Sequence, residues 1–192
     1  MTERQNHLGQ VIADAEKAQG KGLPPVHLWN PDYCGDIGMR IARDGQWYYA
    51  GSPIGRARLV RLFSTILRHD DDGEYYLVTP VEKIRVEVED VPFIATLMSV
   101  EGEGAARTLR FETNVGDIVE AGTEHPLRVE IDPDTGEPSP YIHVRARLEA
   151  RLSRAVFYDL VAICEHTDGQ FGVHSGGVFF PIAPSSEVGD DT

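Results

Sequence analysis

The sequence predicts an α+β protein made of two tandem, related β-α-β units with antiparallel sheets, preceded by an N-terminal helix. Three observations predict this class. Short segments that alternate apolar and polar residues, typical of half-buried strands, recur through most of the 192 residues. Two segments, 59–67 and 156–164, repeat apolar residues at helical spacing instead. Each of these two segments runs into Asp-Gly and then an aromatic-bearing strand, which indicates an internal repeat.

The first unit is predicted over residues 26–98, after a helix and linker at 1–25. A loose apolar stripe at helical spacing precedes a cluster of glycine and proline, which stops the N-terminal helix. The first unit's helix is expected to have Ser52 as N-cap and Pro53 as first residue, and to end before Asp70. The strands predicted in this half are, in order, 39–43, 46–50, 75–79 and 84–88.

The second unit is predicted over residues 99–184, and an acidic, frayed tail over 185–192. Ser153 is the expected N-cap of its helix, and a strand with a basic outer face precedes that helix. The strands predicted from the middle of the chain onward are, in order, 91–100, 108–113, 127–131, 142–148, 171–174 and 178–182.

The two helical segments correspond residue by residue. Arg56 matches Arg154, Leu62 matches Leu160, and each segment leads to an Asp-Gly turn. We interpret this as a duplication, although any chain that alternates helices and strands can show a similar pattern by chance.

Several segments resemble the bacterial domain-of-unknown-function 1285 family. The resemblance covers about residues 25–180 and is most specific between Trp47 and Glu82. The segments that carry it are 44–56, 59–67, 76–83, 88–93 and 148–154. It implies a cytoplasmic α+β protein with a duplicated core, an N-terminal helix and a C-terminal half loosely like a pleckstrin-homology fold. It implies no established activity, and a ligand-binding or signalling role is the usual conjecture.

The net charge of −13 belongs to one segment of the chain. Residues 70–137 hold 18 acidic and 5 basic side chains, so the remaining residues hold 13 of each sign. An acidic excess disfavours non-specific binding to DNA or to an anionic membrane. Two arginine-rich windows interrupt the neutral part; they comprise Arg56, Arg58, Arg61 and Arg68, then Arg145, Arg147, Arg151 and Arg154.

Catalytic and metal-binding motifs are not recognisable in the sequence. The seven histidines have no metal-ligand spacing, and the two cysteines form no redox or metal motif. No glycine-rich phosphate loop or nucleophile elbow is present. The polar N-terminus lacks a signal-peptide core, and no apolar run approaches the length of a membrane span. We therefore expect a cytoplasmic protein without cofactor or metal.

The candidate ligand-binding residues cluster around the two helix starts. The segment 51–56 leads into a helix N-terminus, which can hold an anion, and Arg56 can add a charge-assisted fork. Alternatively, Arg56 pairs with Glu82, and Trp47 packs in the core rather than stacking on a ligand. The full candidate set is Trp47, Tyr49, Ser52, Arg56, Glu82, His143, Arg145 and Arg154.

Three functions fit these observations. The first is a regulatory module with a role in signal transduction, which binds a small anionic, nucleotide-like ligand between the two repeats. The second is a protein–protein signalling adaptor that offers the acidic strands of residues 82–137 to a basic partner. The third is a hydrolase that uses Glu82 or His143, and the lack of a nucleophile–base signature places it last.

Overall fold

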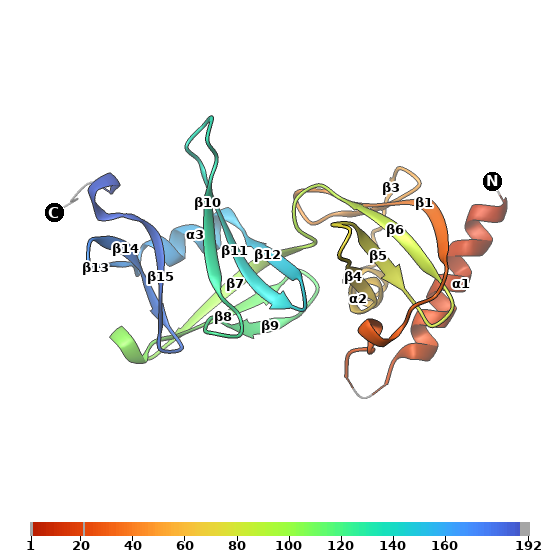
Figure 1. Ribbon diagram of the computed structural model, residues 1–192, viewed down its shortest axis with the longest axis horizontal. Coiled ribbons are helices and arrows are strands. Elements are labelled where there is room, and N and C mark those ends of the chain that lie inside the picture. The colour runs from red at the N-terminus through yellow and green to blue at the C-terminus, as the bar shows by residue number, and fades with distance from the viewer. Residues whose placement is uncertain (1, 21, 189–192) are drawn as a thin grey trace. The chain divides into compact units, whose positions relative to one another are not determined.

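The structure, a computed structural model, describes residues 2–20 and 22–188 and divides into two compact units (Figure 1). Unit 1 comprises the chain up to Pro92 together with Ala146–Leu148, and unit 2 comprises the rest. The predicted boundary between residues 98 and 99 falls inside one continuous strand, Phe93–Glu101. The predicted tail is described as far as residue 188, where a short 3₁₀ helix, η3 (Ser185–Glu187), follows the last strand; residues 189–192 lie outside the described residues.

Unit 1 is one six-stranded mixed sheet with two helices. Its strands lie in the order β3-β2-β1-β6-β5-β4, and every neighbouring pair is antiparallel except β1 and β6. The elements are α1 (Thr2–Ala18), the 3₁₀ helix η1 (Val26–Leu28), β1 (Tyr33–Ile41), β2 (Trp47–Tyr49), β3 (Ser52–Pro53), α2 (Ala57–Thr65), β4 (Leu67–His69), β5 (Tyr75–Val78) and β6 (Lys83–Val88).

The core of unit 1 lies between this sheet and α2. Trp47 on β2 is fully buried, and its ring stacks on Phe63 of α2 with centroids 6.2 Å apart. Met39, Ile41 and Ile84 complete the same core from the central strands. Of the two predicted roles of Trp47, core packing and ligand stacking, the structure has core packing.

The predicted start of the first helix is wrong. Ser52 and Pro53 form β3, which pairs with β2, and α2 begins at Ala57 with Arg56 as its N-cap. The reason is a tight turn at Ala50 and Gly51, whose φ angles of 46° and 81° reverse the chain into a hairpin before a helix can begin.

The same helix also ends earlier than predicted. The hydroxyls of Ser64 and Thr65 donate to the carbonyl oxygens three residues before them, which competes with continuation of the helix. Leu67 then pairs with Leu77 in β4 and β5. Ile66 and Leu67 are buried as their spacing predicted, but as the C-cap and a strand residue.

Unit 2 contains a six-stranded mixed sheet, a separate three-stranded sheet and one α-helix. The larger sheet has the order β10-β11-β12-β7-β8-β9 with β12 and β7 parallel, and the smaller has the order β13-β14-β15. The elements, besides η3, are β7 (Phe93–Glu101), the 3₁₀ helix η2 (Gly104–Ala106), β8 (Thr108–Thr113), β9 (Ile118–Glu120), β10 (Leu127–Ile131), β11 (Pro138–Arg145), β12 (Leu148–Leu152), α3 (Arg154–Val161), β13 (Glu165–Thr167), β14 (Gln170–Ser175) and β15 (Val178–Pro184).

Ser153 caps α3 as predicted. Its Oγ accepts a hydrogen bond of 3.3 Å from the backbone N–H of Val156, which satisfies one amide of the first turn. Val156 and Leu160 are buried, four residues apart on one helical face. The alternation predicted for the preceding strand is also confirmed, because Leu148, Ala150 and Leu152 of β12 are buried.

The order helix, strand, Asp-Gly turn, strand pair recurs in both units. In unit 1, α2 leads through β4 to a turn at Asp72-Gly73 and then to β5 and β6; in unit 2, α3 leads through β13 to Asp168-Gly169 and then to β14 and β15. The sheets differ, however. The three strands after α2 join the large sheet through β6, whereas the three after α3 form a sheet of their own. The α+β class with two tandem units and an N-terminal helix is therefore confirmed, with one parallel strand pair in each large sheet.

Candidate functional site

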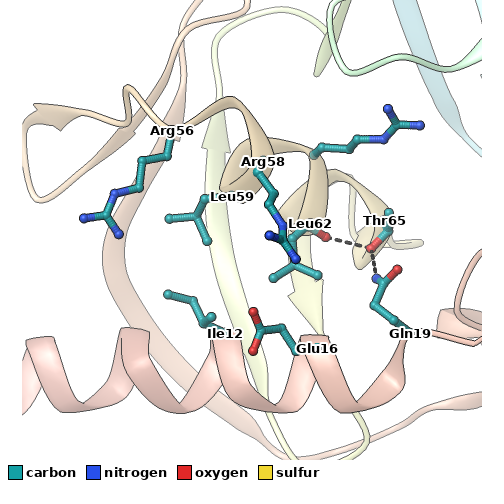
Figure 2. Close-up of a pocket in the computed structure, with 9 residues that line it drawn as sticks. Ile12, Glu16, Gln19, Arg56, Arg58, Leu59, Leu62 and Thr65 are labelled. Atoms are coloured by element: carbon teal, nitrogen blue, oxygen red, sulfur yellow. Dashed lines mark hydrogen bonds between the residues drawn. The ribbon is translucent and has the colours of Figure 1, made fainter.

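The best-formed candidate site is an open groove of about 750 Å³ in unit 1, between α1 and α2 (Figure 2). Aliphatic side chains from both helices form its floor, and arginines from the start of α2 stand along its rim. The residues that line it are Ile12, Glu16, Gln19, Arg56, Arg58, Leu59, Arg61, Leu62 and Thr65.

Helical spacing explains why these side chains meet. On α1, Val11 and Ala15 are fully buried one turn apart, so Ile12 and Glu16 fall on the neighbouring stripe, at the groove. On α2, Phe63 and Ser64 are buried, and Leu59 and Leu62 occupy half-buried positions that line the groove. The groove is thus formed by the flanks of two helices whose main apolar faces are already packed.

One end of the groove is closed by a hydrogen-bonded pair. Gln19 Nε2 donates to Thr65 Oγ1 over 2.9 Å, and Thr65 Oγ1 donates to the Leu62 carbonyl oxygen over 2.7 Å. Arg56 lies at the other end, at the N-cap of α2, and its side chain extends over the groove toward α1 (Figure 2). The groove therefore has a polar, closed end and a cationic end.

The cationic end places positive charge where a helix least favours it. The N-terminus of a helix carries a partial positive charge and unpaired amide groups, so it stabilises anions and disfavours cations. Here Arg56 is the N-cap and Arg58 the second helical residue, the first turn contains no acidic residue, and no side chain caps it. Within the described residues, neither guanidinium has an ion-pair or hydrogen-bond partner, and both side chains are exposed.

Glu16 supplies the acidic group among the residues that line the groove. Its carboxylate points from α1 into the groove, on the side to which the Arg58 side chain descends (Figure 2). With Arg56, Arg58 and Arg61 opposite one carboxylate, the lining keeps a net positive charge on a protein whose formal net charge is −13.

Arg68, the fourth arginine of the same sequence window, has a structural role. Its Nη1 donates to the carbonyl oxygens of Val26 and Trp29, at 2.8 and 2.7 Å, and its Nε bonds Asp70 at 2.5 Å. Lys83 Nζ also bonds Asp70 at 2.6 Å. Burial alone would raise the pKa of Asp70, but the hydrogen bonds and charges of Arg68 and Lys83 outweigh it and hold that pKa below its ordinary value.

The predicted site residues of unit 1 do not all meet. Arg56 lines the groove, whereas Trp47 is in the core, Ser52 is exposed on β3 and Tyr49 is half-buried on β2. Glu82 lies in a turn in which its N–H donates to Thr79 Oγ1 and the Thr79 N–H donates to its carbonyl oxygen. The alternative ion pair between Arg56 and Glu82 does not occur among the contacts of the described residues.

The other three predicted residues belong to unit 2. Arg145 on β11 pairs with Asp117, and its guanidinium lies 5.0 Å from the centre of the Phe93 ring. His143 Nδ1 lies 3.0 Å from the Glu124 carbonyl oxygen, and its ring stacks on His125. Arg154 is exposed at the first position of α3.

Sequence reasoning missed most of the groove. Arg58 and Arg61 were visible as an arginine window without an intervening acid, but Ile12, Glu16 and Gln19 come from a helix far away in the sequence. The spacing of residues 58, 61, 62 and 65 on one helical face was the available signal for the α2 side.

Among the described residues, no group of three or more His, Cys, Asp or Glu side chains could hold a metal ion. In that same part of the chain, no helix combines the length and the apolar character needed to cross a membrane.

The comparisons with known proteins agree with this architecture. Family models of the N-terminal and C-terminal domains of a protein of unknown function, DUF1285, match residues 24–91 and 92–182. The crystal structure of a DUF1285 family protein from Silicibacter pomeroyi DSS-3 is 51% identical, with a TM-score of 0.85, and the match covers 92% of this chain and 96% of that one. A second, from Shewanella baltica OS155, is 30% identical with a TM-score of 0.51 and covers 66% of this chain and 91% of that one. The comparison with curated proteins gave no match. The two family models together span most of the sequence, and the chain therefore belongs to the DUF1285 family.

Proposed function

We propose that this protein is a non-enzymatic, regulatory binding module that takes a small anionic ligand in the groove between α1 and α2. The observation that carries the proposal is the pair Arg56 and Arg58, exposed and without partners among the described residues, at the uncapped N-terminus of α2 beside a groove.

An anion at this position would satisfy two needs of the helix at once. The Leu59 N–H donates to the Arg56 carbonyl oxygen, but within the described residues the amides of Ala57 and Arg58 have no acceptor, and a carboxylate or phosphate can accept from them. The guanidinium groups of Arg56 and Arg58 present paired N–H donors that match such an anion bidentately. The two arginines, which are unfavourable at the N-terminus of α2 when no ligand is bound, would then bind the anion.

The dimensions of the groove suit a small molecule. Its volume of about 750 Å³ lies within the range of roughly 300–1,000 Å³ usual for ligand sites. Its aliphatic floor removes part of the ligand surface from water, which strengthens the contacts to the arginines.

The adaptor alternative has weaker support. It requires free carboxylates on the acidic strands, but Arg110 pairs with Glu101 and Glu120, and Arg128 pairs with Glu130 and Glu149. The hydrolase alternative stays a prediction.

A thermal-shift assay tests the proposal. Phosphate, pyrophosphate and adenosine monophosphate are added to the wild-type protein, to Arg56→Ala and to Arg43→Ala, an exposed arginine of unit 1 outside the groove. We expect at least one anion to raise the Tm of the wild type and of Arg43→Ala, and Arg56→Ala to lose that rise.

The absence of any shift in the wild type, or an equal shift in Arg56→Ala, would contradict the proposal. Arg154→Ala examines separately whether unit 2 participates, as the duplicated arginine suggests, because a role of Arg154 would reduce the shift in that variant as well.

A further inference from the structure

We infer that the groove takes an aliphatic anion, a single carboxylate or phosphate head on an unbranched apolar chain, in preference to a nucleotide. This inference rests on the proposed function and narrows the ligand class by the chemistry of the groove lining.

The floor of the groove is aliphatic. Ile12, Leu59 and Leu62 supply it, and no aromatic ring lines the groove within the described part of the chain. Trp47, the tryptophan among the candidate ligand-binding residues, is fully buried against Phe63 and has no surface for a base to stack on. Nucleobases are usually held by stacking on aromatic side chains, whereas methylene chains need only apolar area.

Two polar side chains at the end of the groove away from Arg56 are bonded to each other. Gln19 Nε2 donates to Thr65 Oγ1, and the Thr65 hydroxyl donates to the Leu62 carbonyl oxygen. These two bonds fix the polar end of the groove, where the far end of a ligand would lie (Figure 2). A methyl terminus needs no hydrogen-bond partner at that end of the groove.

The charges along the groove favour a head of low charge. Arg56 places its guanidinium at one end of the groove, whereas Arg58 descends beside Leu62, on the side of the Glu16 carboxylate that points into the groove (Figure 2). A diphosphate or triphosphate held at Arg56 would bring further negative charge toward Glu16, and like charges at close range repel. One carboxylate or phosphate can engage Arg56 at the end of the groove while its chain passes Leu59 and Leu62.

The length of α2 sets the length of the chain. From Arg56 to Thr65 the helix rises by about 13 Å at roughly 1.5 Å per residue. A medium-length extended chain whose head is held at Arg56 therefore reaches the Gln19–Thr65 pair.

Isothermal titration calorimetry on the full-length protein tests this inference. The probes are hexanoate, octanoate and decanoate below their micelle concentrations, with decyl phosphate, 1-decanol and adenosine monophosphate. We expect Kd to fall by about two- to fourfold for each added methylene, as burial of part or all of each group predicts. Decanol should bind at least tenfold more weakly than decanoate, and adenosine monophosphate more weakly than decyl phosphate.

Two variants separate the head from the chain. Arg56→Ala should weaken decanoate and inorganic phosphate alike, whereas Leu62→Ser should remove the dependence on chain length and leave phosphate binding in place. Leu97→Ser, at an exposed leucine of unit 2, is the control for a lost surface leucine and should titrate as the wild type does.

The outcomes distinguish the inference from the proposed function. Binding of adenosine monophosphate without a chain-length series overturns the inference and leaves anion binding in place. The inference is also overturned if decanoate binds Arg56→Ala as tightly as it binds the wild type, or if decanol binds as tightly as decanoate, because the head would then contribute nothing. If none of the anions gives a heat of binding, both the inference and the proposed function are overturned. A chain-length series that Leu62→Ser abolishes supports the inference.

Discussion

Arginines from one short stretch of sequence have two different roles in unit 1. Arg68 is mostly buried, with 16% of its side chain exposed, and binds two backbone carbonyls and Asp70. Arg56 and Arg58 lie twelve and ten residues earlier in the sequence; they are exposed and have no partner within the described residues. The difference indicates that the first stabilises the fold and the other two are available to a ligand.

Replacement of Arg68 by methionine should therefore destabilise the protein by about 2–4 kcal/mol, because Asp70 and two carbonyl oxygens lose their donor in a mostly buried position. The matched change Arg56→Met should alter stability by no more than about 0.5 kcal/mol, or raise it slightly by removing a cation from a helix N-terminus. Urea unfolding of both variants measures this. Equal losses in the two variants would refute the separation of roles.

Asp70 should make stability depend on acid. Because its pKa in the folded protein lies below its ordinary value, its contribution is present above about pH 4 and is lost as the pH falls through the folded pKa. Asp70→Asn should accordingly be less stable than the wild type at pH 7, and the gap in the free energy of unfolding should narrow toward pH 3. A gap that stays constant between these pH values would show that the carboxylate charge is not the stabilising element.

The two thiols should differ in reactivity. Burial raises the pKa of Cys164 to about 12, so almost none of it is thiolate at pH 8, whereas Cys34 is exposed. Ellman's reagent should label one thiol per native chain at pH 8 and two in denaturant. Cys34→Ser should abolish native labelling and Cys164→Ser should not; the reverse result would contradict the assigned burial.

At the scale of elements, the two helix starts that look alike in sequence differ in structure. Ser153 caps α3 through its hydroxyl, but Ser52 belongs to a strand, and the corresponding position of α2 is held by Arg56. The apolar spacing located both helices, because it depends on residues that pack. The apolar spacing could not locate the start of α2. That start depends on the two-residue turn at Ala50 and Gly51, whose backbone is in the left-handed conformation.

This difference has a measurable consequence. Ser153→Ala should cost about 1 kcal/mol, the usual value of an N-cap, since the Val156 amide loses its acceptor. The free energy of unfolding of Ser52→Ala should stay within about 0.5 kcal/mol of the wild-type value, because Ser52 is exposed and caps no helix. Chemical denaturation of the two variants side by side measures both losses. A larger loss of unfolding free energy in Ser52→Ala than in Ser153→Ala would contradict this assignment.

At the scale of the molecule, the sequence predicted the class, the tandem arrangement and the recurring order around α2 and α3. It did not predict that β1 and β6, or β7 and β12, pair in parallel, because such pairs join strands that are distant in sequence. The groove escaped prediction for the same reason. A third of its lining comes from α1 and the residue that follows it, and the packing of α1 on α2 leaves no local pattern in either helix.

The formal charge of −13 does not oppose an anion in this groove. The whole acidic excess lies in residues 70–137, whereas the groove is lined by residues 12–19 and 56–65 and carries three arginines against one glutamate. At physiological ionic strength, charges more than about 8 Å away are largely screened where they face solvent. The local arginines therefore decide what binds.

The most direct test of the central claim is a two-dimensional ¹H–¹⁵N NMR titration of the protein with decyl phosphate. The account predicts that the perturbed backbone signals belong to α1 and α2, and that the amides of Ala57 and Arg58, in the uncapped first turn of α2, move most. The Arg56→Ala variant should weaken the whole set of changes together. Perturbations confined to unit 2, or a spectrum that does not change at saturating ligand, would contradict the claim that this groove is the binding site.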